Sequence, residues 1–587
     1  MIEKNTTNFW FNKKKLLQWY KLPKKTIISK NNHFYWFPDG KLNVAENCIK
    51  KNIDIGLGKK KAIVYIKENG EEKCTTFNDL QILITKFSSI ICEAINFKKK
   101  NNNILIHGSA SLETSVAMLS SANVGICHCV IFEELENDAI IKRIELIKPN
   151  ILISKTTNLT KIKLFKKLKK KYGYKLIFFD NEFSLDTLVN KKISSNKKKF
   201  IHNSNNRLFT LFTSGSTGVP KGIVHSSAGY LLFAKYTCME KFGLSENSTI
   251  LCASDAGWIN GHTYSLYGPL SIGATSIILE KPILVLNNKK LNTILQKYNV
   301  NILYMPVTLI RTLKAFNKKL KIRSKYLKTL GSMGEPLAKN VASWYAAAFN
   351  LKKKAIVNTY FQTETGGIIC SPKFNDNEKT FGTVGKTLNK FIKLNLKKNL
   401  VENDLSIKTI WPGCMIDVIN ERKVWNKYWN KSGHFNLFDI GSNDKNNNIL
   451  IHGRNDDVIN IRGHRIGSGE IESIIMENDN IAEACVVPIE DEIEGNEIII
   501  FAVINNNNKN LIKNIENKIF NVFGSFALPK EIFFVTALPK TRSGKIMRRL
   551  LKNMLSKKNN NIGDTSTMLN KECLAEIRNK ILGRVSH

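Results

Sequence analysis

The chain has few of the residue patterns that mark metal, disulfide or membrane proteins. Its eleven cysteines form no Cys-x-x-Cys pair, and its ten histidines are dispersed, which argues against a zinc site. The two closest cysteines, Cys127 and Cys129, would point to one face of a strand, where we expect ordinary packing. No run reaches about 18 apolar residues, and the N-terminus has no basic segment followed by an apolar core. We therefore expect a soluble, cytoplasmic protein in a reducing setting, with no membrane insertion.

Acidic residues are scarce, because 49 Asp and Glu stand against 89 Lys and Arg, for a formal net charge of +40. Such an excess normally indicates nucleic-acid binding. Here, however, lysine occurs with asparagine in scattered runs such as 98–103, 196–199 and 557–561, and no stretch interleaves aromatic with basic residues. We therefore predict no specific nucleic-acid partner, only weak adhesion to polyanions at low salt.

The chain does have enough hydrophobic sequence, 43% of 587 residues, for large cores. At ~150 residues per domain, this length predicts about three or four units. From about residue 61, short apolar strands alternate with helical stretches, which indicates an α/β fold with doubly wound parallel sheets. Strands are predicted at 104–106, 129–132, 248–254, 275–279, 302–305 and 355–361, and helices at 113–123 and 138–147.

The pattern changes near residue 454. The following segment predicts a compact, mobile α+β domain, with strands at 483–488, 497–504 and 531–536 and helices after 469–472 and around 510–522. We therefore divide the chain into an aromatic, loop-like N-terminal extension (1–60), a large domain (61–454), a small C-terminal domain (455–555) and a tail (556–587).

The first of two loops that indicate chemistry is at residues 213–222, which read TSGSTGVPKG. Its glycines let the backbone approach a polyphosphate, its hydroxyls donate hydrogen bonds and Lys221 adds a charge. It is not a Walker P-loop, because Lys221 lies six residues after Gly215 and is followed by Gly222. A flexible surface turn is the alternative, but the apolar runs on either side (208–212 and 223–225) favour a phosphate site.

The second loop, 538–545, reads LPKTRSGK and ends in Lys545. It belongs to the predicted small domain, whereas the first loop belongs to the large domain. A phosphate loop and a distant lysine together predict ATP chemistry that a second, mobile domain completes.

With these loops in place, the chain resembles the adenylate-forming superfamily and, within it, the acetyl/propionyl-CoA synthetases. The resemblance covers nearly the whole length, in blocks that follow the family's order. They are WFPDGKLN (36–43), DAGWINGH (255–262), YGPLSIGAT (267–275), GSMGEP (331–336), QTETGG (362–367), GRNDDVI (453–459), GHRIG (463–467), PKTRSGKIMRR (539–549) and GDTST (563–567).

This resemblance implies two half-reactions at one site. A carboxylic acid attacks the α-phosphate of ATP to give acyl-AMP and pyrophosphate, and the thiol of CoA then displaces AMP. Acetate is the implied acid, with propionate or another short-chain acid as the alternative. A degenerate binding protein with the same fold is the further alternative, which the presence of Lys545, Glu364 and Asp439 disfavours.

The resemblance also implies a nucleotide site. The phosphate loop would hold the β- and γ-phosphates, the 334–336 segment would form one wall of the adenine slot, and Tyr360 would stack on the base. Asp439 would accept hydrogen bonds from the ribose, although residues 434–436 depart from the family's Tyr-x-x-Gly-Asp run, so its placement rests on Arg454. The implied ATP contacts are Thr213, Ser214, Gly215, Ser216, Thr217, Gly218, Lys221, Gly334, Glu335, Pro336, Asn358, Thr359, Tyr360, Phe361, Gln362, Thr363, Asp439, Arg454 and Arg465.

For catalysis, the resemblance implies that Thr363 and Glu364 meet the α-phosphate and a magnesium ion, with Glu364 as the metal ligand. Arg465 would add positive charge. Lys545 would touch both the attacking carboxylate and the α-phosphate. Asp456 matches the hinge about which the small domain swings. Because acetylation would remove the charge of Lys545, a lysine acetylase and a deacetylase are candidate partners.

The acyl and CoA ends depart from the family's acetyl-specific pattern. The pocket would be lined by Trp258, Ile259, Asn260, Met333 and Phe361, with Phe361 where acetyl enzymes carry tryptophan and Met333 where they carry valine. One methylene is worth ~1–3 kcal/mol, so the resemblance implies a preference for acetate rather than a strict rule.

At the CoA end, the implied contacts are Asn260, Arg462 and Gly463. The family's Arg-Gly-Gly-Arg stretch is absent near 155–163, and Phe520 stands where an arginine is expected. Arg462 is expected to compensate by pairing with the CoA phosphates. Weaker CoA binding or a different acceptor is therefore left open.

Overall fold

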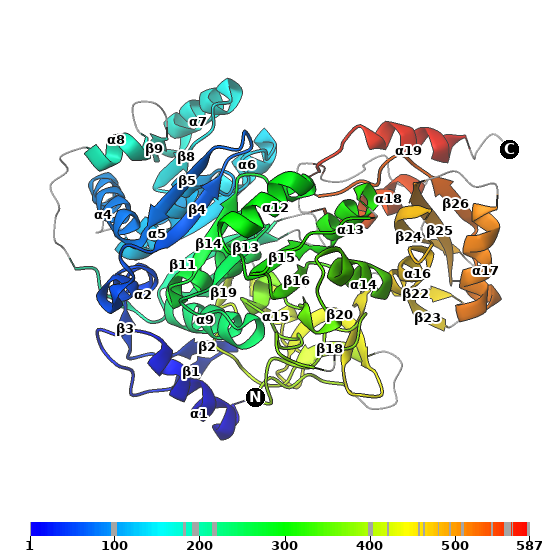
Figure 1. The fold of residues 1–587 in the computed structure, drawn as a ribbon, viewed down its shortest axis with the longest axis horizontal. Helices are drawn as coiled ribbons and strands as arrows, with labels where there is room; N and C mark the ends of the chain where they lie inside the picture. Colours follow the sequence, from blue (N-terminus) through cyan, green and yellow to red (C-terminus); the bar gives the residue numbers. More distant parts are fainter. Residues whose placement is uncertain are drawn as a thin grey trace.

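The computed structural model describes residues 2–95, 102–179, 184–190, 199–213, 220–317, 319–377, 379–396, 403–419, 422–455, 458–461, 464–478, 480–491, 495–505, 510–541, 544–556, 565 and 568–583. Two large sheets with their helices make up most of the molecule, and a smaller group of strands and helices at one side carries the C-terminus (Figure 1). The predicted α/β class, with a large N-terminal and a small C-terminal domain, is confirmed. The exact domain boundaries stay predictions. None of the helices in the described ranges is long and apolar enough to span a membrane.

The first sheet has seven strands, and those from β11 to β9 run parallel. Helices α5 (Leu112–Val124), α6 (Asn137–Ile147) and α7 (Leu159–Tyr172) connect its successive parallel strands, as parallel pairing requires. The spatial order is β19 (Asp417–Ile419), β12 (Lys221–Ser226), β11 (Arg207–Thr213), β7 (Cys127–Ile131), β6 (Asn103–His107), β8 (Ile151–Ser154) and β9 (Lys175–Phe178). Cys127 and Cys129 are both buried on β7, which confirms their expected packing role.

The second sheet also has seven strands, all parallel except the edge strand β5. Helices α12 (Asn288–Lys297), α13 (Val307–Phe316) and α14 (Lys339–Ala348) belong to this half. The strand predicted at 355–361 ends early, at Asn358, and the chain after it forms a functional loop. The order is β17 (Ile356–Asn358), β16 (Thr329–Met333), β15 (Ile302–Pro306), β13 (Thr249–Cys252), β14 (Thr275–Leu279), β4 (Lys61–Ile66) and β5 (Glu72–Thr76).

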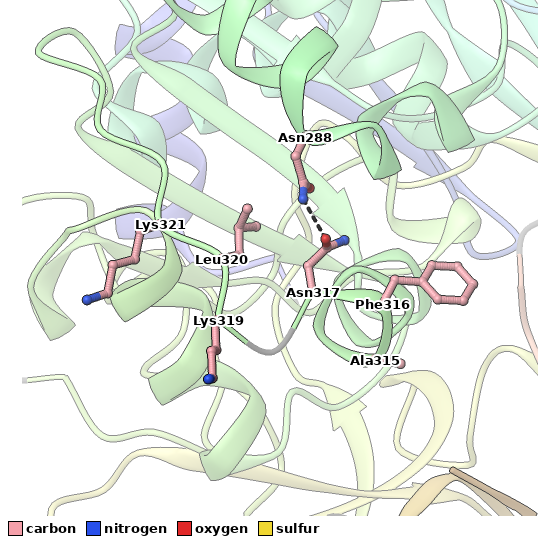
Figure 2. Close-up of a pocket in the computed structure, with 7 residues that line it drawn as sticks. All are labelled: Asn288, Ala315, Phe316, Asn317, Lys319, Leu320 and Lys321. Carbon is pink, nitrogen blue, oxygen red and sulfur yellow. Dashed lines mark hydrogen bonds between the residues drawn. The ribbon is translucent and has the colours of Figure 1, made fainter.

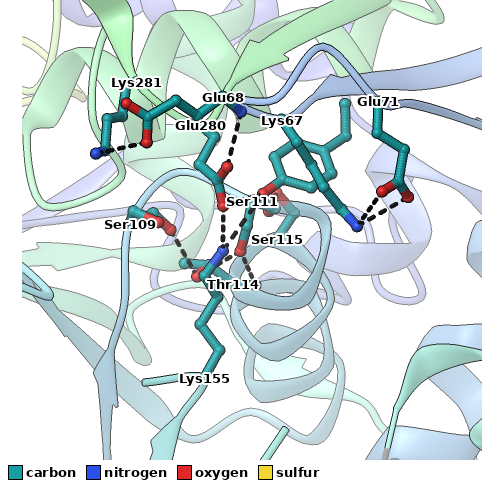
Figure 3. A network of polar contacts seen from close by, with 11 residues as sticks. Lys67, Glu68, Glu71, Ser109, Ser111, Thr114, Ser115, Lys155, Glu280 and Lys281 are labelled. Atoms are coloured by element: carbon teal, nitrogen blue, oxygen red, sulfur yellow. Dashed lines mark hydrogen bonds and ion pairs between the residues drawn. The ribbon is translucent and has the colours of Figure 1, made fainter. Parts of the chain in front are cut away.

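A polar network joins the ends of the two large sheets (Figure 3). Lys155, just after β8 of the first sheet, forms an ion pair of 3.0 Å with Glu280, just after β14 of the second. Glu280 also accepts hydrogen bonds from the Tyr65 hydroxyl (2.8 Å) and the Glu68 backbone amide (2.9 Å). Because these groups are only partly exposed, the bridge fixes the two sheets against each other at the edge where parallel-sheet enzymes bind ligands.

A third, antiparallel sheet was not predicted. Its strands are β18 (Asn403–Ile407), β20 (Phe435–Asn443) and β21 (Ile449–Arg454). Strands β18 and β20 contain asparagine and aspartate, which are depleted from strands, and this explains why the sequence pattern did not indicate them.

The expectation of a loop-like N-terminal extension is wrong. Residues 4–48 form α1 (Lys4–Asn12), β1 (Ile27–Lys30), β2 (His33–Trp36), β3 (Lys41–Leu42) and α2 (Val44–Cys48). The aromatic side chains explain the order, because Trp10 and Phe37 are fully buried and Trp10 packs edge-on against Tyr236 of α9 (Ser227–Phe242).

The small domain contains a hairpin, a three-stranded sheet and covering helices. Strands β24 and β25 are antiparallel, and β26 runs parallel to β25. The predicted strands and helices of this domain are confirmed. They are α16 (Ser468–Ile475), β24 (Ile481–Asp491), β25 (Gly495–Ile504), α17 (Leu511–Phe523) and β26 (Glu531–Phe534). The structure adds four elements that were not predicted, β22 (Val458–Ile461), β23 (His464–Gly467), α18 (Arg548–Leu555) and α19 (Cys573–Leu582).

Four buried histidines make the stability of the large domain depend on pH. Burial lowers the pKa of His107 to about 3, of His225 to about 4 and of His262 to about 3, and it lowers the pKa of His128 well below its ordinary value. Below pH ~6.5 the unfolded chain therefore binds more protons than the folded chain. Lowering the pH from 6.5 to 5 should thus reduce the free energy of unfolding by about 2 kcal/mol per histidine. Burial raises the pKa of Asp255 to about 7, which acts in the opposite direction.

We expect urea unfolding to give a lower unfolding free energy at pH 5 than at pH 7, since four histidines outweigh the buried carboxyls Asp255 and Asp439. His107→Gln should reduce the slope by about one proton, because glutamine does not titrate. An unfolding free energy that is equal at the two pH values would contradict this account.

Candidate active site

The predicted nucleotide residues gather at the carboxyl ends of β16 and β17. These strands are parallel neighbours, so the segments that follow them, 334–336 and 359–362, leave the sheet at the same edge. Gly334 has φ +90°, a conformation that favours glycine, and it is exposed together with Pro336. Glu335 forms a largely buried ion pair with Arg311 of α13.

Asn358 and Thr359 have their side chains bonded to the scaffold. Asn358 accepts from the Ser332 hydroxyl (2.9 Å) and donates to the Thr383 carbonyl (2.9 Å). Thr359 donates to the Ser332 carbonyl at 2.7 Å, and its hydroxyl lies 2.7 Å from that of Tyr304. Both residues are buried, so in this arrangement they support the loop that follows β17.

Asp439 is the centre of a buried polar cluster. Its Oδ2 accepts from the Tyr360 hydroxyl (2.5 Å) and from Gln362 Nε2 (2.6 Å), and its Oδ1 lies 3.5 Å from Nη1 of Arg454, its register partner across β20 and β21. Burial raises the pKa of Asp439, while Arg454 opposes the rise. Among the described residues, Arg454 makes the contact with Oδ1, and its greater length leaves Oδ1 the better placed oxygen for accepting hydroxyl groups.

Phe438, directly before Asp439, has φ +54°, a left-handed conformation that is rare for a bulky residue. The resemblance places a glycine here, and the structure explains why, since glycine adopts this φ without strain. The Phe438 ring packs edge-on against Tyr428 at 5.3 Å, and the Arg454 guanidinium lies 5.9 Å from its centroid. The departure at 434–438 therefore does not displace Asp439 from Arg454.

Thr363 and Glu364 lie in a short 3₁₀ turn (Thr363–Thr365) whose carbonyls all face the scaffold. Because a carbonyl only accepts, His225 must donate through Nε2 to the first of them. The three carbonyls of the turn and that of Gly366 are held from three segments of the chain, which fixes the turn and leaves the side chains of Thr363 and Glu364 partly exposed. The bonds are His225 Nε2 to Thr363 O (2.7 Å), Met415 N to Glu364 O (2.9 Å), Trp411 Nε1 to Thr365 O (3.0 Å) and Thr263 Oγ1 to Gly366 O (3.0 Å).

Thr213 and Lys221 are paired in register across β11 and β12, so they bracket the predicted phosphate loop. Several predicted residues lie outside the described part of the chain: Ser214, Gly215, Ser216, Thr217, Gly218, Asp456, Arg462 and Gly463, together with the side chain of Arg465.

Phe361, a predicted acyl-pocket residue, is partly buried between two apolar clusters. Phe361 packs against the apolar cluster that contains Ile259 and against the one that contains Met333. Trp258 is half-buried, with its ring centroid 4.9 Å from that of Phe132. Asn260, beside them, has a buried Oδ1 with no hydrogen-bond partner among the described residues.

Lys545 reaches the large domain from the small one. It is exposed, and its charge lowers the pKa of Asp439. The preceding Gly544 has φ +83° and packs closely on Thr308 of α13, because a Cβ at 544 would lie 2.5 Å from Thr308 Oγ1. The loop that carries Lys545 thus packs on the N-terminal turn of α13.

The sequence argument missed three residues of this site: Tyr428, His225 and Thr308. Tyr428 donates to Glu364 Oε1 at 2.7 Å. No sequence spacing indicates any of the three, since their partners lie far away along the chain.

A separate surface hollow of about 630 Å³ at the end of α13, lined by Phe316, Lys319 and Lys321 among others, contains none of the predicted site residues (Figure 2).

Comparison with known proteins agrees with this geometry. Family models match the AMP-binding enzyme over residues 56–400, the AMP-binding enzyme C-terminal domain over 470–545 and the acetyl-coenzyme A synthetase N-terminus over 2–48. The acetyl-coenzyme A synthetase of Leptospira biflexa is 32% identical (95% of this chain, 92% of the relative). That of Helicobacter pylori is 33% identical (96% and 91%).

Among solved structures, the acetoacetyl-CoA synthetase of Streptomyces lividans has a TM-score of 0.82 at 16% identity, over 98% of this chain and 92% of that one. An anthranilate CoA ligase in complex with anthranoyl-AMP has a TM-score of 0.76 at 17% identity, over 87% and 96%. At these identities the two structures show the same fold. The chain belongs to the AMP-binding enzyme family, within the branch of the acetyl-coenzyme A synthetases.

Proposed function

We propose that this protein joins acetate to CoA at the expense of ATP. In the first half-reaction a carboxylate oxygen attacks the α-phosphorus, the bond to the bridging oxygen breaks and pyrophosphate leaves. In the second, the CoA sulfur attacks the acyl carbon, loses its proton and expels AMP. No covalent enzyme intermediate is required, so the residues act by positioning and by offsetting charge.

The observation that carries this proposal is the packing of Gly544, and with it the neighbouring Lys545, on Thr308 of the large domain, which also holds the Asp439 cluster. A lysine delivered from the small domain to the ribose side of a nucleotide site is placed to offset charge between two anions, the carboxylate and the α-phosphate. In the same proposal Asp439 and Arg454 hold the ribose, Gly334 to Pro336 face the adenine, and Lys221 with the phosphate loop holds the outer phosphates.

Magnesium is the metal we propose for the phosphates. No group of three or more ligand residues that could hold a metal occurs in the described segments, which suits a cation held mainly by phosphates, water and one carboxylate. Glu364 would be that carboxylate, since its side chain is partly exposed and, among the described residues, a donor is bonded to Oε1 alone. The ion would neutralise phosphate charge.

Two finer features belong to this proposal. Acetylation of the exposed Lys545 would remove the charge needed for adenylation, so an acetylase and a deacetylase are proposed regulators. We propose the cytoplasm as the place of action, supported by eleven free cysteines, which fit a reducing compartment.

The test is pyrophosphate release with magnesium-ATP and a series of acids from acetate to octanoate, each with and without CoA. We expect turnover with acetate and, more weakly, propionate, because the buried Met333 and the partly buried Phe361 pack in one apolar cluster and would leave room only for a short acyl chain. Continuous turnover should require CoA. A single burst that CoA does not extend would contradict CoA as acceptor, and turnover only with longer acids would contradict acetate.

A further inference from the structure

Tyr428 makes a contact that links it to the predicted phosphate chemistry. It follows α15 (Arg422–Lys427) and is 2% exposed, so substrates do not reach it. Its hydroxyl donates to Oε1 of Glu364 at 2.7 Å. Within the described parts of the chain, no residue donates to Oε2, so the bond leaves one carboxylate oxygen available on the ligand side.

The ring of Tyr428 contacts two further site elements. Lys221 Nζ lies 5.8 Å from the ring centroid, within the range of a cation–π contact. On another side, Phe438 packs edge-on at 5.3 Å, and Phe438 is the residue whose left-handed backbone immediately precedes Asp439. One side chain therefore contacts β12, the 363–365 turn and β20, which carry the phosphate lysine, the metal carboxylate and the ribose carboxylate.

We propose that Tyr428 is a positioning residue for adenylation, which orients Glu364 by its hydroxyl and supports Lys221 and Phe438 by its ring. A carboxylate that binds a metal needs a fixed orientation, and outer partners of metal ligands commonly supply it. The inference rests on the proposed function, because it assumes that Glu364 and Lys221 serve the phosphates and their cation.

The chemistry of the pair suits a fixed donor. A phenol hydroxyl has an ordinary pKa of ~10, so it is a donor at neutral pH, and a carboxylate is an acceptor. Glu364 is itself anchored through its backbone carbonyl, which accepts from Met415 N at 2.9 Å. With the backbone fixed and Oε1 bonded, the remaining freedom of the carboxylate is small.

Two variants separate the hydroxyl from the ring. Tyr428→Phe removes only the hydroxyl, and Tyr428→Leu removes the ring contacts as well. We expect Tyr428→Phe to lower acetate-dependent ATP–pyrophosphate exchange by about 10- to 100-fold, the range for a lost hydrogen bond to a charged group, and Tyr428→Leu to lower it further. Conversion of added acetyl-AMP and CoA to acetyl-CoA should change by less than about twofold in Tyr428→Phe. The matched control is Tyr172→Phe, which removes a surface tyrosine–glutamate bond of 2.6 Å to Glu145 and should change neither reaction.

A binding measurement supplies a readout other than turnover. By calorimetry, the gain in ATP affinity on adding Mg²⁺ should shrink by about 10-fold in Tyr428→Phe, while affinity without metal should stay as in the unaltered protein. Equal losses in both half-reactions and in metal-free ATP binding would show a merely structural role and overturn the proposal, as would a Tyr428→Phe variant that behaves normally. If the unaltered protein itself exchanges no pyrophosphate, the proposed function fails instead, and the calorimetry still decides the role of Tyr428.

Discussion

Lys545→Ala should lower acetate-dependent ATP–pyrophosphate exchange by roughly 1,000-fold, because it removes a positive charge that the small domain brings to the site. The same variant should convert added acetyl-AMP and CoA to acetyl-CoA at a nearly normal rate. The second half-reaction involves no attack of one anion on another, so it does not need this charge. Measuring the two half-reactions separately therefore tests the role directly.

Two further variants define what this result means. Lys552→Ala removes an exposed lysine of α18 in the same domain and should leave both half-reactions unchanged. Gly544→Ala keeps Lys545 but places a Cβ against Thr308 at a φ of +83°, so it should imitate Lys545→Ala by displacing the loop. If Lys545→Ala slowed both half-reactions equally, the lysine would support the fold or general binding rather than adenylation.

The alternation of strands and helices could be predicted because buried parallel strands are short apolar runs, and 275–279 is a clear example that became β14. The third sheet could not. Its strand β20 contains Asn436, Asp439 and Ser442, and it is held by backbone pairing and by the aromatic packing of Phe435 and Phe438 on Tyr428. The prediction for the N-terminal extension is wrong for the reverse reason. We interpret its aromatic residues as part of a loop, but Trp10 and Phe37 are buried against the large domain.

The site divides along a similar line. Motif residues such as Thr363, Glu364 and Asp439 could be named from the sequence, because the resemblance carries them. Their supports could not be named. Tyr428 lies 64 positions from Glu364, and only the folded chain brings the two side chains within 2.7 Å. The position of Phe438 is a different case. Its backbone is left-handed, which a glycine in the sequence would have indicated and a bulky residue does not.

Asp439→Asn should lower kcat/KM for ATP by roughly 100- to 1,000-fold, because a neutral amide accepts hydroxyl hydrogen bonds far less well than a carboxylate. The loss should depend on the ribose. For 2′,3′-dideoxy-ATP, which has no hydroxyl to offer, the variant and the unaltered protein should have similar, low kcat/KM values. The comparison of four kinetic constants thus isolates the contact between Asp439 and the ribose from every other effect of the substitution.

A measurement of folding stability is the control for this comparison of two proteins with two nucleotides. Burial raises the pKa of Asp439, which means that the folded chain bears a cost for keeping this carboxylate charged at neutral pH. Replacing it with asparagine removes that cost and retains an oxygen for the Tyr360 hydroxyl, so the urea midpoint at pH 7 should stay unchanged or rise. A variant that unfolds at lower urea, and that loses the same factor with ATP and with the dideoxynucleotide, would show that Asp439 holds the 360–362 loop in place and does not bind the ribose.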